Sequence, residues 1–462
     1  MNVHEIIQAT KAAKGSNNKI GLLNNNSNNK LLENFLATTY DTRVSFYVNK
    51  FTMGEPSVQA YDDIEVENML DFVQSLSERL LTGNAALEAI TEFTGQLSAE
   101  GQSLFNMLIK RDIKAGVAAG TLIKVWPKSI FIEPYQRCCL AKDTKTDLRN
   151  WGMYISQLKA DGMFSSASCS TEIGHIASRA GTIYPKSAAF DLVNSELQSH
   201  AHLEAFPGVL VGDCTVEGEL IVVKDGKELL RAESNGMLNS LQQSGEALPE
   251  GYDLVYHVWD ILPTARRTYK GTFNVAYKQR FDVIERLFGQ AGVRVKPIET
   301  KFFNTYAECV AHFLETIGLG KEGTIIKHPS ATWMDGDNPL QIKMKIEAEC
   351  ELRVKGFNPA EEASKYEHQF GSLQCESEDG LLAVGVSSGL TDAMRTELHA
   401  MGDSLIECVI TVKFNDVMLP KEDQNKHSLF LPRFVELRLD KSSADSLPRI
   451  FDIFEDAKKN AS

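Results

Sequence analysis

At 462 residues the chain is too long for one hydrophobic core, and we expect roughly two to four domains. With 43% apolar and 24% charged residues it has the composition of a soluble globular protein, and it contains no apolar run long enough to span a membrane. A net charge of −14 argues against a protein that coats nucleic acid, but it is compatible with an enzyme that has one basic contact face.

The cysteines and the N-terminus indicate the compartment. The eight cysteines form no Cys-x-x-Cys pair and no zinc-type spacing, and adjacent Cys138 and Cys139 do not suit a simple disulfide bond. Residues 1–5 do not resemble a signal peptide. We therefore expect reduced thiols and a cytoplasmic protein.

Residues 1–132 have the apolar spacing of helices. Leu87 and Ile90 share one helix face, and Asn84 is predicted to cap that helix at its start. The asparagine-rich stretch 17–29 is predicted to be a loop.

A basic stretch at 110–116 ends in glycine and precedes a helix predicted over 120–126, which Pro127 ends. Backbone N–H groups at such a glycine turn could approach a phosphate. Two ordinary packed helices with a solvated charged face explain the same residues equally well.

From about residue 133 the pattern changes to short strands separated by turns, as in a mixed α+β domain that ends near residue 346. Amphipathic helices are predicted over 277–288 and 306–317. Strands are predicted over 152–158, 209–211, 215–223, 255–262, 322–327 and 341–346, with a further strand ending at 178.

From about residue 347 the chain is predicted to be nearly all β. The expected strands are 352–357, 372–376, 381–386 and 405–414, and the one clear helix covers 392–401. Short strands with a single helix in about 100 residues suit an oligonucleotide-binding (OB) barrel.

Lys159 directly follows the strand predicted at 152–158, and Asp161 and Gly162 then form a turn. A lysine at the end of a rigid strand, facing a cleft, is where a nucleophilic amine would be placed. The alternative is a surface lysine beside an ordinary turn, and this short pattern alone favours that alternative.

Other polar residues of the same domain could complete a site for a nucleotide attacked by a lysine amine. Nearby ammonium groups and a divalent metal disfavour the charged form of a lysine, and carboxylates are the ligands that Mg²⁺ needs. Each residue also has an ordinary structural explanation, such as core packing for the tryptophan or a solvated strand face for the lysines. The candidates are Arg179, Glu219, Trp259, Glu322, Lys327, Lys343 and Lys345.

Together these residues resemble the ordered motifs of ATP-dependent DNA ligases, most closely the bacteriophage type. The resemblance covers almost the whole chain, with supporting stretches at 69–72, 81–86, 124–127, 234–236 and 429–432. The motifs are Lys159-Ala160-Asp161-Gly162, Ser178-Arg179-Ala180-Gly181, Glu217-Gly218-Glu219-Leu220, Val258-Trp259-Asp260, Glu322-Gly323, Lys343-Met344-Lys345 and, near the end, Arg438-Leu439-Asp440-Lys441.

The resemblance implies a site that uses ATP and Mg²⁺. Lys159 would become AMP-lysine, AMP would pass to the 5′-phosphate at a nick, and the 3′-hydroxyl would then displace it. Glu219 and Glu322 would serve metal and ribose, and Trp259 the adenine. The other implied nucleotide contacts are Gln157, Leu158, Arg179, Lys327, Lys343 and Lys345, with Arg438 and Lys441 orienting the pyrophosphate.

The resemblance also implies three domains. These are an all-α DNA-binding domain at 1–132, an α+β nucleotidyltransferase (adenylation) domain at 133–346 and a β-barrel OB-fold domain at 347–462. They would form a clamp around nicked duplex DNA, which suits a monomer that needs no membrane. A phage-encoded protein would act in the cytoplasm of its host.

The chain departs from the family at two places. Phe164 occupies the position where the family usually has an arginine that holds the 5′-phosphate at the nick. The region 334–337, where phage relatives carry an arginine, is acidic. Our hypothesis is that Arg179 or Arg231 partly substitutes.

Three rival interpretations exist. An RNA ligase or a capping guanylyltransferase shares the central motifs, but the helical region before Lys159 argues against both. NAD-dependent ligases carry a cysteine-rich zinc module that has no counterpart here. A nick-binding protein that has lost ligation is supported only by Phe164.

Overall fold

The computed structural model describes residues 1–48, 50–141, 144, 146–172, 174–229, 231–244, 247–289, 293–361, 364–419 and 425–460, without the side chains of 231, 232, 243, 244, 459 and 460. These residues fold as two compact units. One comprises Met1–Arg137, Asp161–Ile298 and Ser330–Asn338, and the other comprises Cys138–Ala160, Glu299–Pro329 and Pro339–Ser462. In the described part of the chain, no helix combines the length and apolar character needed to cross a bilayer.

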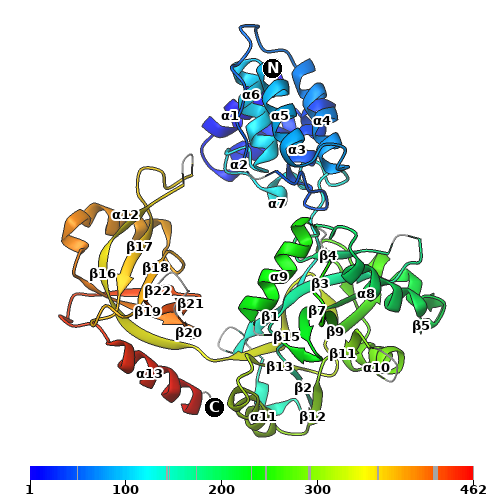
Figure 1. Ribbon diagram of the computed structural model, residues 1–462, viewed down its shortest axis with the longest axis vertical. Coiled ribbons are helices and arrows are strands. Elements are labelled where there is room, and N and C mark those ends of the chain that lie inside the picture. The colour runs from blue at the N-terminus through cyan, green and yellow to red at the C-terminus, as the bar shows by residue number, and fades with distance from the viewer. Residues whose placement is uncertain are drawn as a thin grey trace. The chain divides into compact units, whose positions relative to one another are not determined.

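The first unit begins with a bundle of helices, drawn in blue to cyan in Figure 1. Its core contains Phe35, Ile90 and Phe105, all fully buried. The described residues before Gln136 include no strand. The helices are α1 (Val3–Ala12), α2 (Ser16–Asn25), α3 (Lys30–Tyr40), α4 (Ile64–Ser77), α5 (Gly83–Gly95), α6 (Ala99–Ile109) and α7 (Ala119–Leu122).

Two local predictions in this bundle were wrong. Most of the stretch predicted as a loop at 17–29 forms α2, because Leu23 is buried in the core and fixes a helix that its asparagines do not favour. The N-cap of α5 is Thr82, and Asn84 lies one residue inside the helix.

The first unit also contains a six-stranded sheet in the order β11-β9-β7-β3-β4, with β8 paired to β7. Helices α8 (Ala188–Ser199) and α10 (Tyr277–Phe288) pack against β9, and α9 (Arg231–Ser244) packs against β7. The bounds of α10 confirm the predicted helix. The strands are β3 (Met163–Ser168), β4 (Ile176–Ser178), β7 (Cys214–Lys224), β8 (Lys227–Glu228), β9 (Tyr252–Pro263) and β11 (Val295–Pro297), with the small pairs β5 (Glu204–Phe206) with β6 (Val209–Leu210) and β10 (Thr272–Phe273) with β14 (Trp333–Met334).

The central element of the second unit is a five-stranded sheet in the order β1-β15-β13-β2-β12. Helix α11 (Tyr306–Gly318) covers one face, where Cys309 packs with Tyr154, Ile326 and Ile342. The strands are β1 (Gln136–Leu140), β2 (Tyr154–Leu158), β12 (Thr300–Phe303), β13 (Gly323–Lys327) and β15 (Gly336–Lys345).

A second five-stranded sheet, antiparallel and in the order β18-β17-β16-β19-β22, follows in the same unit. Helix α12 (Asp392–Met401) has the bounds predicted from sequence, whereas α13 (Leu447–Asn460), drawn in red in Figure 1, was not predicted. The strands are β16 (Ala348–Pro359), β17 (Phe370–Glu376), β18 (Ala383–Val386), β19 (Val409–Phe414) and β22 (Arg433–Arg438), with the small pair β20 (Asp416–Met418) and β21 (Ser428–Phe430).

Candidate active site

One face of the sheet β15-β13-β2 gathers the predicted lysines. Ile325 on β13 stands opposite both Gln157 on β2 and Lys343 on β15. Lys345 stands opposite Gly323, and Lys327 lies two residues beyond Ile325. Because residues directly opposite each other, and those two apart on one strand, point to the same face, Gln157, Lys327, Lys343 and Lys345 share that face.

The opposite face of this sheet is its core face. Tyr154, Ile326 and Ile342, which alternate with the site residues, pack there against α11. Leu158 alternates with Gln157 along β2, so its side chain points to the core face. Only its main-chain atoms lie beside the face that carries the lysines. Its N–H donates to the carbonyl oxygen of Glu299 at 2.9 Å.

Lys159 extends from the end of β2. Its N–H donates to Gly323 O at 2.9 Å, and its Nζ forms an ion pair with Glu322 Oε2 at 2.5 Å. Both side chains are about one quarter exposed, at 24% and 23%. The structure therefore brings together two residues that the sequence had placed more than 160 positions apart, and the amine of Lys159 must give up a proton before it can act as a nucleophile.

Cys138 is a neighbour of these lysines that sequence reasoning missed. It lies on β1, and its thiol donates to Gln341 Oε1 at 3.8 Å. Burial raises the pKa of the Cys138 thiol, while the charges of Lys327, Lys343 and Lys159 oppose that rise. Cys138 thus lies within the electrostatic influence of three of the predicted lysines.

Lys345 contacts residues that flank the strands of the C-terminal sheet. Its Nζ lies 3.4 Å from Glu347 Oε1 and 3.4 Å from Asn415 Oδ1, and Glu347 also pairs with Arg433 at 3.0 Å. Burial lowers the pKa of Lys345, and the positive charge of Arg433 adds to this, although Glu347 opposes it. Lys345 therefore loses its proton more easily than an exposed lysine does.

In the first unit, β3, β7 and β9 bring a second set of predicted residues together. Phe164 on β3 and His257 on β9 both stand opposite Glu219 on β7, so the three side chains share one face. Glu217 pairs with Asp260 and Gly218 with Val258, which leaves Trp259 as the extra residue of a β-bulge. Such bulges redirect a side chain, and the ring of Trp259 lies 5.9 Å from that of Phe164.

Arg179 follows β4 and rests on two aromatic rings. Its guanidinium lies 5.0 Å over the ring of Tyr135 and 5.7 Å from that of Phe164. The two rings meet edge to face at 4.8 Å, and Phe164 is buried. Among the described contacts, the cation that lies beside the apolar surface of Phe164 is therefore Arg179.

The two glutamates of the Glu217-Gly218-Glu219 motif have different environments. Glu217 is 1% exposed, pairs with Arg267 at 2.9 Å and accepts a hydrogen bond from Trp333 Nε1 at 3.2 Å. Burial raises the pKa of Glu217, and Arg267 opposes this. Glu219 is only partly buried. The fully buried carboxylate of the motif is therefore Glu217, and neither its burial nor its partner Arg267 was predicted from the sequence.

The cations of the final motif lie on the C-terminal sheet and the turn after it. Arg438 ends β22, and both Arg438 and Lys441 contact Glu351 on β16, at 2.7 and 3.1 Å. Arg438 also pairs with Asp440 at 2.7 Å. Glu351 had no role in the sequence prediction.

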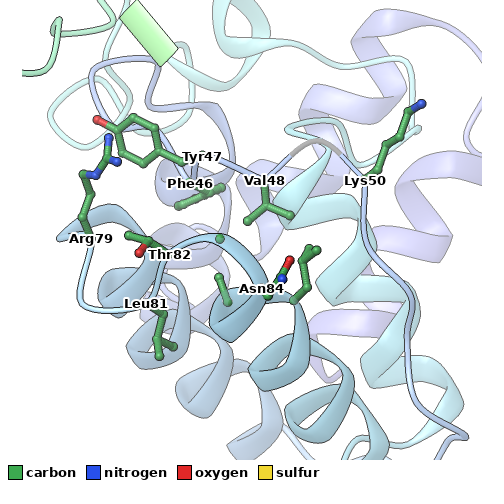
Figure 2. Close-up of a pocket in the computed structure, with 11 residues that line it drawn as sticks. Phe46, Tyr47, Val48, Lys50, Arg79, Leu81, Thr82 and Asn84 are labelled. Atoms are coloured by element: carbon green, nitrogen blue, oxygen red, sulfur yellow. The ribbon is translucent and has the colours of Figure 1, made fainter. Parts of the chain in front are cut away.

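A pocket of about 380 Å³ lies in the helical bundle at the start of α5, and residues of the stretch 81–86 form part of its lining. Figure 2 shows Arg79 beside Tyr47 at one side of this pocket and Lys50 at the other. The guanidinium of Arg79 lies 4.7 Å over the ring of Tyr47. Thr82 makes no side-chain hydrogen bond to the first turn of α5, so the N–H groups of this turn have no cap from that side chain.

Comparisons with known proteins decide the family. Residues 138–345 match the model of the ATP-dependent DNA ligase domain. The chain is 25% identical to the DNA ligase of Enterobacteria phage T6 over 98% of its own length and 99% of the relative, and the DNA ligase of Enterobacteria phage T4 gives the same values. The chain belongs to the ATP-dependent DNA ligases.

A solved structure titled Pmar-Lig_PreS3 shares the fold of this ligase, with a TM-score of 0.71 and 18% identity over 95% of this chain and 99% of that one. Among the described residues of the ligase, no group of three or more His, Cys, Asp or Glu side chains is placed to hold a metal ion. The donors that the ligase does offer, single carboxylates such as Glu219 and Glu322, fit Mg²⁺, which usually takes one or two carboxylates and completes its shell with phosphate oxygens and water.

Proposed function

We propose that this ligase seals 5′-phosphate/3′-hydroxyl nicks in duplex DNA through a covalent AMP on Lys159. The observation that carries the proposal is the lysine face of the sheet β15-β13-β2. There Lys159 extends from β2 beside Glu322, and Lys327, Lys343 and Lys345 share one side. A phosphate held on such a face meets a nucleophilic amine and several cations at once.

In the first step the neutral amine of Lys159 attacks the α-phosphorus of ATP. A P–N bond forms, the P–O bond to pyrophosphate breaks, and the proton of the amine leaves to solvent. Lys343 and Lys345 neutralise the charge that develops on the α-phosphate. Gln157 and the main chain of Leu158 line the nucleotide, and Lys327 lies on the same face as Gln157.

The remaining nucleotide contacts come from the face that carries Glu219. Trp259, redirected by its bulge, stacks on the adenine, and Glu219 serves the ribose. Glu219 and Glu322 would each offer a single carboxylate to Mg²⁺, which when bound would neutralise phosphate charge. Arg438 and Lys441 orient the leaving pyrophosphate when the C-terminal domain, which we assign as an OB-fold, closes over the nucleotide.

In the second step the 5′-phosphate at the nick attacks the lysyl-AMP, so that a P–O–P bond forms and the P–N bond breaks. In the third step the 3′-hydroxyl attacks the same 5′-phosphate and AMP leaves. We assign the grip on that phosphate to Arg179, because it is the cation beside Phe164. The side chain of Arg231, the other residue considered for this role, lies outside the described residues.

The helical domain contributes the grip on DNA. Arg79 and Lys50, at the pocket beside the start of α5, suit contacts with backbone phosphates, which carry affinity without sequence preference. We propose that one copy of the chain encircles the nicked duplex as a clamp. In a phage-infected cell this would occur in the host cytoplasm.

The experiment is to incubate the ligase with α-labelled ATP and Mg²⁺, separate the protein by denaturing electrophoresis, and then add nicked DNA. Label that survives denaturation and leaves as the nick is sealed is the expected result, and Lys159→Ala should take up no label while still binding the nick. Absence of label on the folded wild-type protein would overturn the proposal. A nicked RNA duplex in parallel distinguishes a DNA ligase from an RNA ligase.

A further inference from the structure

The two cations of the final motif converge on one buried oxygen atom. Arg438 Nη1 donates to Glu351 Oε1 at 2.7 Å, and Lys441 Nζ donates to the same oxygen at 3.1 Å. The side chain of Glu351 is 11% exposed, whereas that of Lys441 is 40% exposed. The carboxylate is therefore a fixed anchor below two cations that reach the surface.

The sheet and the following loop hold Glu351 in place. Glu351 stands opposite Thr411 on β19, and Thr411 Oγ1 lies 3.2 Å from both carboxylate oxygens. The N–H of Glu351 donates to Asp445 Oδ2 at 2.8 Å, and the N–H of Asp445 donates back to Glu351 O at 2.9 Å. The segment that carries Lys441 is thus tied to the same strand as the carboxylate.

The cations keep donors for a ligand while they are held. Asp440 accepts from Nε and Nη2 of Arg438 at 2.9 and 2.7 Å, and Glu351 accepts from Nη1. A guanidinium has five N–H donors and an ammonium has three. Among the described contacts, N–H groups of both Arg438 and Lys441 therefore remain for the oxygens of a phosphate.

Without Glu351 the arrangement would not persist. Two positive charges that contact the same oxygen atom repel each other, and each flexible side chain gains rotamer freedom when they separate. We propose that Glu351 is a positioning residue that holds Arg438 and Lys441 side by side so that both meet the pyrophosphate leaving from ATP. This inference rests on the proposed function, in which these two cations orient the pyrophosphate.

The test is Glu351→Gln, which keeps the shape of the side chain and removes its charge. We expect the kcat of lysyl-AMP formation to fall by about ten- to a hundredfold, as misplaced catalytic groups do, with a much smaller change in KM for ATP. Sealing of a nick that already carries AMP should be unchanged, because no pyrophosphate is present in that step. Glu351→Asp should recover part of the lost kcat. Arg438→Ala measures how far the kcat of lysyl-AMP formation falls when one of the two cations is removed.

A matched control lies two residues away on the same strand. Glu349 pairs with Lys413 at 2.8 Å, outside the final motif, and Glu349→Gln should form lysyl-AMP at the wild-type rate. The inference is overturned if Glu351→Gln forms lysyl-AMP at that rate, or if it loses sealing of the AMP-carrying nick to the same degree. It is also overturned if Arg438→Ala has no effect. A wild-type enzyme that takes up no label would instead overturn the proposed function, and this inference with it.

Discussion

Replacing the partner of Glu217 should destabilise the ligase far more than neutralising Glu219. In the Arg267→Met variant the carboxylate of Glu217, 1% exposed, keeps only the Trp333 N–H as a partner in the described contacts. Glu133, which also pairs with Arg267, loses that cation as well. Breaking a buried ion pair by removing one partner costs about 3–5 kcal/mol, because a charge is left uncompensated away from water.

The same reasoning ranks the other variants. Glu217→Gln leaves Arg267 paired with Glu133 and should cost about 1–3 kcal/mol, as expected for a weakened buried hydrogen bond. Glu219→Gln, at a partly buried position, should change the free energy of unfolding by only about 0.5 kcal/mol, yet it should abolish most lysyl-AMP formation. The double variant Arg267→Met/Glu217→Gln should be more stable than Arg267→Met alone, because no uncompensated charge remains on Glu217.

Urea unfolding followed by tryptophan fluorescence measures these differences, since Trp259 and Trp333 both belong to the first unit. Adenylation assays on the folded variants then separate stability from chemistry. A cost below about 1 kcal/mol for Arg267→Met, or a double variant no more stable than that single variant, would refute the reasoning. So would a Glu219→Gln enzyme that adenylates normally.

Three further predictions concern the nick, the α-phosphate and pH. Arg179→Ala should slow sealing of an AMP-carrying nick and leave lysyl-AMP formation intact. Phe164→Leu should slow the same step by only about two- to fivefold, since Arg179 is exposed and a cation–π contact at an exposed site contributes about 0.5–1 kcal/mol. Because burial lowers the pKa of Lys345, its charge should be lost at lower pH than that of an exposed lysine, so the alkaline fall of the adenylation rate should move to higher pH in Lys345→Arg. Burial also lowers the pKa of His312, whose Nδ1 lies 2.9 Å from Ser156 Oγ, so the stability it contributes is complete above about pH 6.5 and is lost as pH falls through its lowered pKa. His312→Gln should flatten that acid slope in urea unfolding, by at most about 1.4 kcal/mol per pH unit.

Strong periodicity made part of the fold predictable. Helices α10 and α12 have the predicted bounds, because their apolar residues recur at helical spacing and no competing turn residue interrupts them. Alternation along residues 341–346 likewise indicates that Lys343 and Lys345 share a face, and the register of β13 with β15 agrees. By contrast, α2 is a helix only because tertiary packing buries Leu23, and nothing local in its asparagine-rich sequence indicates that burial.

The part of the site that could not be predicted depends on pairing between strands. The bulge at Trp259 exists because β7 matches one residue where β9 has two, and alternation along β9 alone cannot reveal it. For the same reason the sequence could not tell which glutamate of the motif is buried. Glu217 is buried because Arg267 and Trp333, distant in the chain, arrive beside it, while Glu219 faces Phe164 and His257 across the sheet.

This distinction explains how motif residues divide their work in the ligase. Lys159, Glu219 and Lys343 are partly exposed, whereas Glu217 and Glu351 are buried and contact other residues of the chain. Glu217 holds the strand that presents Glu219, and Glu351 holds the two cations of the final motif. Both are carboxylates anchored by cations, and a buried carboxylate is costly unless it is paired. The need to pair each buried carboxylate therefore fixes the positions of the residues around it. A neutral replacement of Glu217 or Glu351 should loosen these neighbours before it changes the fold.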